Sequence, residues 1–171
     1  MEEWRTMTAL ATGIKAPEFA LKTLEGKKFS LADELARGPV VLAFFKVSCP
    51  TCQYAFPFLE RLHKAYGSKG VTLVGVSQND AKETAAFGKD FAVTFAMLLD
   101  DTRTYPVSNA YGLTNVPSIF WIAQDGEIEV SSVGWVKADF EAINRKMAEH
   151  GKTAPAAMFR AGEEVRDFRA G

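Results

Sequence analysis

The change from a strand pattern to a helix pattern near residue 48 constrains the fold of this chain most strongly. Residues 40–47 are mostly β-branched and aromatic, which is typical of a strand buried on both faces of a sheet. Directly after them, apolar residues recur every three or four positions and predict a helix with one apolar face. These apolar positions are Ala55, Phe58, Leu59, Leu62, Ala65 and Tyr66. A core strand that leads straight into an amphipathic helix indicates an α/β fold.

The rest of the chain repeats this alternation. The further strand patterns cover residues 19–24, 27–31, 71–76, 95–99, 118–123 and 127–133. The helix patterns cover residues 81–91 and 104–111 and a final segment with Phe140, Ile143 and Met147 on one side. The first two strands are expected to form a hairpin, and the last two an antiparallel edge. The remaining alternation predicts a mostly parallel sheet with helices on both faces.

Length and composition indicate one domain with a substantial core. The chain has 171 residues, of which 47% are hydrophobic. We expect residues 1–15 to be an N-terminal lead-in and residues 16–150 to form the domain. Residues 151–171 are rich in Ala, Gly, Arg and Glu, and they predict an extension of low intrinsic order that docks through Phe159 and Phe168.

Charge and hydropathy exclude several classes of protein. The 20 Lys and Arg residues nearly balance the 21 Asp and Glu residues, which argues against a nucleic-acid-binding protein. The longest apolar run, residues 40–45, is far shorter than the roughly 18 residues that a membrane span needs. The N-terminus lacks a positive start followed by a long apolar stretch, so no secretory signal is predicted. A cytoplasmic location is expected, or an extracytoplasmic one if a leader has been removed.

The two cysteines, Cys49 and Cys52, stand at the predicted junction of strand and helix. Two cysteines placed at random would be three positions apart only about one time in a hundred. The free N–H groups and the dipole of a helix start stabilise a thiolate, and they lower a cysteine pKa from about 8.5 towards about 7 or below. Cys52 lies one turn further in and is placed to attack a disulfide at Cys49. The sequence therefore predicts Cys49 as the attacking thiol and Cys52 as the resolving thiol.

Two other interpretations of this pair stay open. The cysteines are inert core residues, or they are half of a zinc site. A zinc site needs two more ligands, and the two histidines, His63 and His150, are far apart in the sequence. We therefore predict neither a metal nor a cofactor.

Val116 and Pro117 form a second candidate feature, directly before a predicted strand. X–Pro bonds adopt the cis form at low cost, and a cis-proline in such a turn is usually a deliberate feature. In the expected layout Pro117 faces the helix start that carries Cys49. There it leaves the backbone groups of Val116 free to pair with an extended substrate peptide. The alternative is an ordinary loop proline that begins a strand.

These motifs together resemble the thioredoxin superfamily. The motifs are residues 44–52 (FFKVSCPTC), Pro57 five positions after the second cysteine, and Val116, Pro117 and Ser118. The hairpin and the extra helix–strand unit at about residues 80–99 resemble its TlpA-like and AhpC/TSA branch. The resemblance covers roughly residues 15–150. It implies a thioredoxin-like α/β fold with a mixed central sheet flanked by helices, an N-terminal hairpin and a central helix–strand insert. It also implies a cis Pro117 and thiol–disulfide exchange through Cys49 and Cys52.

Several positions depart from the thioredoxin pattern. Ser48 replaces a Trp before the first cysteine, Ala43 replaces a buried acid, and Ala55 replaces the Glu of membrane-tethered relatives. The group that deprotonates Cys52 is therefore not evident. Lys46 is either a stabilising cation for the Cys49 thiolate or a solvated lysine at a strand end.

The sequence thus predicts a thiol–disulfide oxidoreductase. Its expected partners are a disulfide-containing protein or small thiol substrate and an upstream electron donor or acceptor. The alternative is a peroxiredoxin-like peroxidase, in which Cys49 attacks a hydroperoxide. Leu42 and Lys46 stand where that pattern has Pro and Thr or Ser, and Arg103 is the candidate donor to the peroxide. A binding module without redox turnover is a third alternative.

Overall fold

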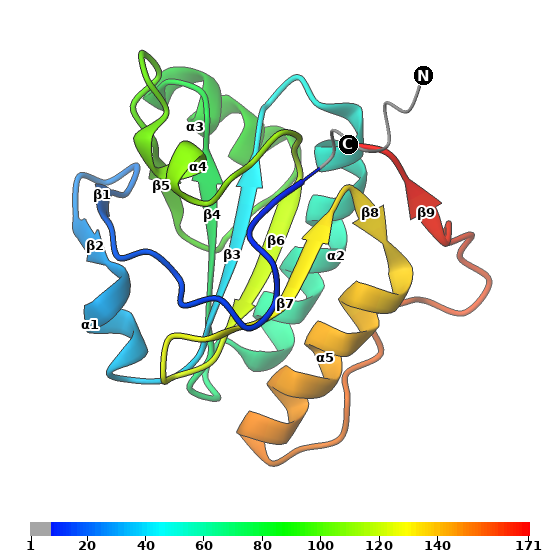
Figure 1. Ribbon diagram of the computed structural model, residues 1–171. Helices are drawn as coiled ribbons and strands as arrows, with labels where there is room; N and C mark the ends of the chain where they lie inside the picture. Colours follow the sequence, from blue (N-terminus) through cyan, green and yellow to red (C-terminus); the bar gives the residue numbers. More distant parts are fainter. Residues whose placement is uncertain (1–7) are drawn as a thin grey trace.

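Five strands form a mixed central sheet in the computed structural model, which describes residues 8–171 (Figure 1). The strand order is β5–β4–β3–β6–β7, with β3, β4 and β5 parallel and β6 and β7 antiparallel to their neighbours. The strands are β3 (Val40–Phe45), β4 (Thr72–Ser77), β5 (Met97–Leu99), β6 (Ser118–Ile122) and β7 (Ile128–Val133). The predicted mixed sheet, with its last two strands antiparallel, is confirmed.

The central strand β3 is buried along its whole length and divides the core into two layers. Its odd-numbered residues face α2 (Pro50–Tyr66), α3 (Ala81–Asp90) and α5 (Lys137–Gly151). Its even-numbered residues pack with Tyr111 and Phe120 on the other face. Because both faces are covered, the strand shows no apolar–polar alternation in the sequence.

Short elements cover the second face of the sheet. They are the hairpin of β1 (Ala20–Lys22) and β2 (Lys28–Ser30), the helix α1 (Leu31–Leu35) and the helix α4 (Pro106–Ala110). The hairpin is confirmed, whereas α1 was not predicted. Ser30 caps this helix, because its side chain accepts a hydrogen bond from the Asp33 N–H. A helix of five residues is too short to show a helical period in the sequence.

The carboxyl ends of β3 and β4 are tied together next to the cysteines. Asp80 is the N-cap of α3, and its carboxylate accepts a hydrogen bond of 2.8 Å from the Glu83 N–H. The neighbouring Asn79 accepts a 2.9 Å bond from the N–H of Val47. The loop between β3 and α2 is thereby fixed against the start of α3.

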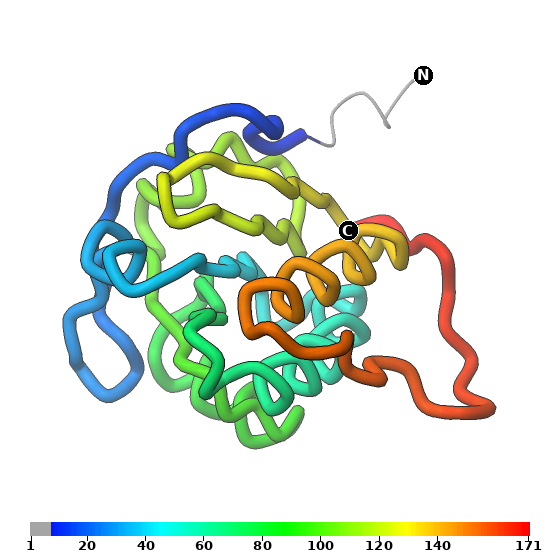
Figure 2. Tube along the Cα trace, turned by 90° about the horizontal axis from the view of Figure 1, so that it is seen from below, coloured from blue at the N-terminus to red at the C-terminus, as the bar shows by residue number. Residues whose placement is uncertain are grey.

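The segment after α5 returns along the molecule to the start of α2 (Figure 2). Phe159 packs as predicted, with its ring centroid 5.5 Å from that of Phe58. The prediction that Phe168 docks is wrong, since this residue is 56% exposed. The segment docks there through its backbone instead, because β9 (Phe168–Arg169) pairs antiparallel with β8 (Trp135–Val136).

The N-terminal segment crosses the edge of the sheet at β7. Residues 1–7 of the predicted lead-in lie outside the described residues. Further on, the Gly13 N–H donates to the Ile128 carbonyl, and the Ile128 N–H donates to the Ile14 carbonyl. Within residues 8–171, no helix combines the length and the apolar character that crossing a membrane requires.

Candidate active site

Cys49 is the N-cap residue of α2. Its backbone is extended, with φ −82° and ψ 114°, and Pro50 occupies the first helical turn. The Sγ atom of Cys49 accepts a hydrogen bond of 3.1 Å from the N–H of Cys52. Proline suits this place because the first N–H groups of a helix have no partner within it. The thiol thus replaces the side-chain oxygen of an ordinary cap.

The two thiols differ in exposure. Both cysteines are free, with Cys49 partly exposed and Cys52 fully buried. Ala43 and Ala55 lie in the same core cluster as Cys52 and are also fully buried. Neither of these two side chains can take a proton from Cys52. One thiol is open to an incoming disulfide and the other is protected from it.

The loop before β6 faces the cysteines, as predicted. The peptide bond between Val116 and Pro117 is cis. In its protonated form, the Cys49 thiol donates a hydrogen bond of 3.4 Å to the Val116 carbonyl. Gly171 packs against the same carbonyl, since a Cβ added to Gly171 would lie 2.5 Å from the Val116 O atom. The Val116 carbonyl is therefore covered whether or not Cys49 is protonated. The prediction that the backbone groups of Val116 are free to pair with a substrate is therefore wrong for the carbonyl group.

The two thiols differ in pKa because their environments differ. The hydrogen bond from the Cys52 side chain is the largest influence that lowers the pKa of Cys49, to about 6. The N–H groups of Cys52 and Thr51 and the charge of Arg169 lower this pKa further, while burial opposes them. Burial is also the main cause that raises the pKa of Cys52 above its ordinary value. Near neutral pH, Cys49 is a thiolate and Cys52 a thiol.

We expect alkylation of Cys49 by iodoacetamide to titrate with a pKa of about 6 in the folded protein. Only the thiolate reacts, so the rate falls as the pH drops through that value and is flat well above it. In denaturant the midpoint should return to about 8.5. Cys52→Ala should raise the Cys49 pKa by removing a donor, whereas Cys52→Ser keeps one. A midpoint near the ordinary value in the folded protein would contradict this assignment.

The cation that acts on Cys49 comes from the C-terminal segment. Arg169 lowers the pKa of Cys49 through its charge, and its guanidinium carbon lies 5.6 Å from the ring centroid of Tyr54. Lys46 lines the depression beside Cys49, but its side chain is exposed. Arg169 could not be identified from the sequence, because 120 positions separate it from Cys49 and no local pattern links them.

A depression lies next to Cys49. Its lining includes the polar residues Gln78 and Asn115 and the apolar residue Leu113. Val116 and Gly171 also line it. Polar and apolar side chains together surround the partly exposed sulfur of Cys49, so the depression can take a small molecule that carries a disulfide.

The structure does not bring Arg103, the candidate donor to a peroxide, or Leu42 to Cys49. The Leu42 side chain lies in the core on the other face of the sheet. The Arg103 side chain is 87% exposed and pairs with Asp101 at 3.4 Å. Neither is among the residues that line the depression. Within residues 8–171, no group of three or more His, Cys, Asp or Glu side chains is placed to hold a metal ion.

Comparison with known proteins supports the same assignment. The AhpC/TSA family pattern matches residues 12–131. The thiol-disulfide oxidoreductase ResA of Geobacillus kaustophilus is 32% identical over 136 residues, which cover 78% of this chain and 76% of that protein. ResA of Geobacillus thermodenitrificans is 33% identical over 123 residues, which cover 71% and 69%.

Solved structures agree with the fold described above. A thioredoxin-family thiol:disulfide interchange protein from Chlorobium tepidum aligns with a TM-score of 0.66 at 27% identity. The alignment covers 81% of this chain and 99% of that chain. The thioredoxin-like fold expected from the sequence is confirmed. The chain belongs to the AhpC/TSA family and, within it, to the thioredoxin-fold thiol–disulfide oxidoreductases.

Proposed function

We propose that Cys49 and Cys52 are the redox pair of this oxidoreductase and exchange two electrons with a substrate disulfide. The observation that carries the proposal is the contrast between the two sulfurs. Cys49 is partly exposed with its pKa lowered to about 6, whereas Cys52 is fully buried with its pKa raised. A lowered thiol pKa at an accessible helix start is typical of an attacking cysteine.

The reaction consists of two exchanges that conserve sulfur and electrons. The Cys49 thiolate attacks one sulfur of the substrate disulfide, and the other substrate sulfur leaves as a thiolate that takes up a proton. Cys52 then loses its proton and attacks the Cys49 Sγ atom. The second substrate sulfur leaves as a thiolate, and a disulfide joins the two cysteines. The substrate is reduced by two electrons and the protein is oxidised by two.

The Cys52 proton is released only when it is needed. In the resting protein the Cys52 side chain donates a hydrogen bond to Cys49, and burial disfavours its ionisation. Once Cys49 is in a mixed disulfide, its negative charge is gone and this charge no longer opposes the Cys52 thiolate. The resolving step is therefore easier after the first exchange than before it.

Val116 and Pro117 are proposed to bind the substrate beside the reacting sulfurs. The Val116 carbonyl lies 3.4 Å from the Cys49 Sγ atom, so a polypeptide whose cystine reaches Cys49 passes over this loop. We place the reacting cysteines and the cis-proline loop in the domain of residues 16–150, and we treat residues 151–171 as an extension that contributes Arg169 to the site.

Trapping the mixed disulfide tests this assignment. We expect Cys52→Ser to accumulate a covalent adduct with insulin or with a cystine peptide. Cys49 still attacks the substrate disulfide in this variant, and no second cysteine resolves the adduct. Cys49→Ser should give no adduct, since the buried Cys52 does not meet the substrate. Non-reducing gel electrophoresis followed by mass spectrometry of the linked peptides provides the measurement.

The double variant Cys49→Ser, Cys52→Ser is the matched control for non-specific adducts. An adduct on Cys52 in the Cys49→Ser variant would contradict the proposal that Cys49 is the attacking sulfur. If Cys52→Ser forms no adduct under conditions that trap other thiols, the proposed exchange through Cys49 is contradicted. The result would then favour a binding module without redox turnover.

The partner and the location depend on the reduction potential of the pair. An upstream dithiol donor restores the reduced form if the protein is a reductant, and an acceptor restores the disulfide if it is an oxidant. Known couples range from about −270 mV for reductants to about −120 mV for strong oxidants. A value near the first supports the cytoplasmic location that the sequence predicts, and a value near the second supports an extracytoplasmic one.

A further inference from the structure

The last residues of the chain lie on the loop that faces Cys49. We call residues 168–171 the C-terminal strap. The Thr51 hydroxyl, from the first turn of α2, donates a 2.6 Å hydrogen bond to the Ala170 carbonyl. The Asn115 side-chain amide donates a 3.4 Å bond to the Gly171 carbonyl, next to Val116. The strap thus lies between the helix that carries the cysteines and the cis-proline loop.

The surface under the strap fits a main chain. Gly134 has φ +77°, and a Cβ added to it would lie 2.6 Å from the Arg169 carbonyl oxygen. On the other side, a Cβ at Gly171 would lie 2.5 Å from the Val116 carbonyl oxygen. Backbone therefore meets backbone at both places, with no room for a side chain between them. We call the surface formed by Thr51, Val116 and Gly134 the strap groove.

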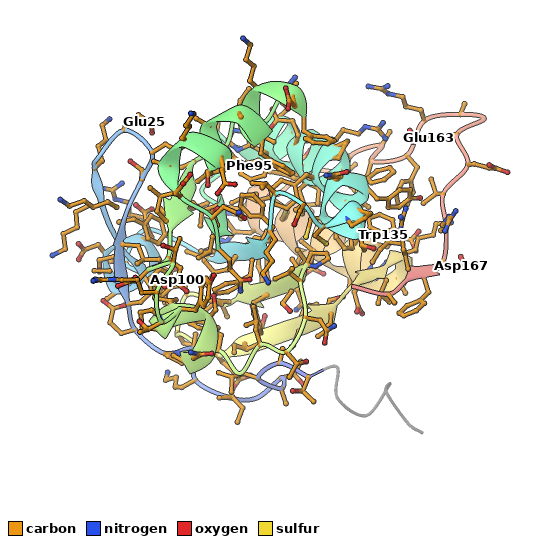
Figure 3. All side chains as sticks on the ribbon, turned by 90° about the horizontal axis from the view of Figure 1, so that it is seen from above. Glu25, Phe95, Asp100, Trp135, Glu163 and Asp167 are labelled. Atoms are coloured by element: carbon orange, nitrogen blue, oxygen red, sulfur yellow. The ribbon has the colours of Figure 1, made fainter. Side chains whose placement is uncertain are left out.

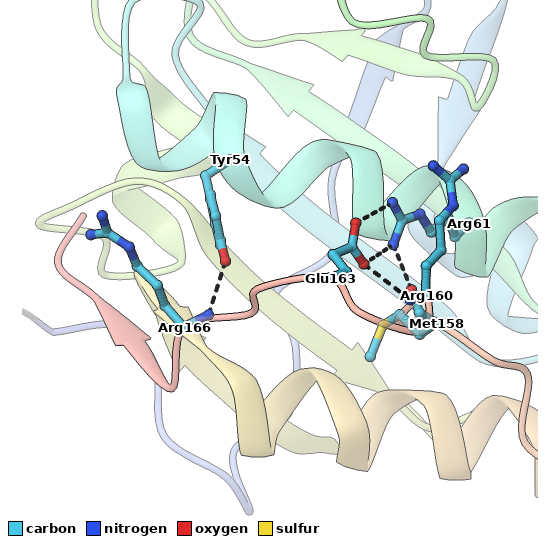
Figure 4. Close-up of polar contacts among 6 residues, drawn as sticks. All are labelled: Tyr54, Arg61, Met158, Arg160, Glu163 and Arg166. Atoms are coloured by element: carbon cyan, nitrogen blue, oxygen red, sulfur yellow. Dashed lines mark hydrogen bonds and ion pairs between the residues drawn. The ribbon is translucent and has the colours of Figure 1, made fainter.

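Side chains hold the chain just before the strap (Figure 4). The Arg61 guanidinium binds both carboxylate oxygens of Glu163, at 2.7 and 2.8 Å, and also the Met158 carbonyl. The Tyr54 hydroxyl accepts a 3.0 Å hydrogen bond from the N–H of Arg166. Paired, two-pronged contacts of this kind fix both position and direction. The segment before residue 168 is therefore anchored independently of the strap.

The strap itself is held mainly by its own backbone groups. Its first two residues pair with β8, and the carbonyls of Ala170 and Gly171 accept the bonds from Thr51 and Asn115. Phe168 is exposed, while Arg169 adds a contact over the Tyr54 ring. An extended peptide with a small residue where Gly171 lies offers the same N–H and C=O groups, so such a chain can replace the strap by strand addition.

We propose that the strap groove is the docking surface for an extended segment of a protein substrate, and that residues 168–171 occupy it as an internal competitor. The inference rests on the proposed function, because the groove leads to Cys49 through Val116. A protein disulfide must displace the strap to bind, which raises its KM. A small disulfide reaches Cys49 through the depression beside it, which Gly171 and Val116 also line, and needs no displacement of the strap.

Removal of residues 170–171 tests the proposal and retains Arg169. We expect about tenfold lower KM for insulin, because binding no longer requires opening of the strap. The rate with 2-hydroxyethyl disulfide should stay within about twofold of the full chain, since this small substrate enters the depression without displacing the strap. Glu164→Ala, an exposed substitution in the same segment, is the matched control and should change neither rate.

A second measurement does not depend on turnover. A synthetic peptide of residues 163–171 should bind the shortened protein and shift the amide resonances of Thr51, Val116 and Gly134, whereas the full chain should bind it more weakly. Equal insulin kinetics in both proteins, or peptide binding elsewhere on the surface, would overturn the internal-competitor role. If neither protein reduces either disulfide, the proposed function fails, and the peptide titration still decides whether the groove binds an extended chain.

Discussion

Replacing Cys49 with serine is expected to lower the rate of insulin reduction by roughly a thousandfold or more, because a serine hydroxyl is a weak nucleophile without an adjacent base. The variant should remain folded. Serine is among the preferred N-cap residues, so it can accept the bond from the Cys52 N–H that Cys49 now accepts at 3.1 Å. The loss should therefore reflect chemistry and not a damaged helix start.

Turbidity of insulin with dithiothreitol as the reductant measures this effect. A melting temperature within a few degrees of the unmodified protein should accompany the loss, since serine preserves the cap. A Cys49→Ser variant as fast as the unmodified protein would remove Cys49 from the reaction. A slow variant with a much lower melting temperature would point to unfolding instead.

The part of the site that could be predicted from the sequence is local. Strand β3, the start of α2 and the cysteine spacing follow one another within 13 residues, from Val40 to Cys52. These features depend on residues that are close together in the sequence. A strand buried on both faces, a helical period and a helix cap can each therefore be recognised from neighbouring residue types. The cis bond at Pro117 is expected from the resemblance to the thioredoxin superfamily, while the residues alone leave an ordinary loop proline open.

The rest of the site depends on contacts between distant residues. Thr51 and Ala170 are 119 positions apart, and their bond uses a backbone carbonyl that any residue would supply. The paired strands β8 and β9 have two residues each, too few to show a period. Phe168 was predicted to dock because it is apolar, yet its backbone and not its ring makes the contact. Pairing through main-chain groups leaves no signature in residue types.

Trp135 links the hydrophobic core to the C-terminal segment (Figure 3). It is fully buried, and its ring centroid lies 4.2 Å from that of Phe140 and 4.8 Å from that of Phe58. Its indole N–H donates a 2.6 Å hydrogen bond to the Arg166 carbonyl, and its backbone pairs opposite Arg169. One residue therefore supports both the α2–α5 packing and the strand that carries the cation of the site.

Trp135→Ala is accordingly expected to lower the free energy of unfolding by about 3–5 kcal/mol, through lost burial and the cavity left behind. Trp135→Phe is the matched variant: it keeps most of the ring and loses the indole N–H, which leaves the Arg166 carbonyl without this donor, so about 1–3 kcal/mol is expected. Urea denaturation followed by circular dichroism measures both changes.

The same two variants should separate core packing from the placement of Arg169. If Trp135 holds β9 in place, Trp135→Ala moves Arg169 away from Cys49, and the Cys49 pKa rises slightly above about 6, because the charge of Arg169 is the smallest of the influences that lower it. Trp135→Phe retains the β8 backbone and the ring stack, so its Cys49 pKa should stay close to that of the unmodified protein. Equal losses of stability in the two variants would show that the hydrogen bond to Arg166, and not the ring, carries the contribution of Trp135. An unchanged Cys49 pKa in a destabilised Trp135→Ala protein would show that the anchors at Arg61 and Tyr54 suffice to keep Arg169 beside the thiolate.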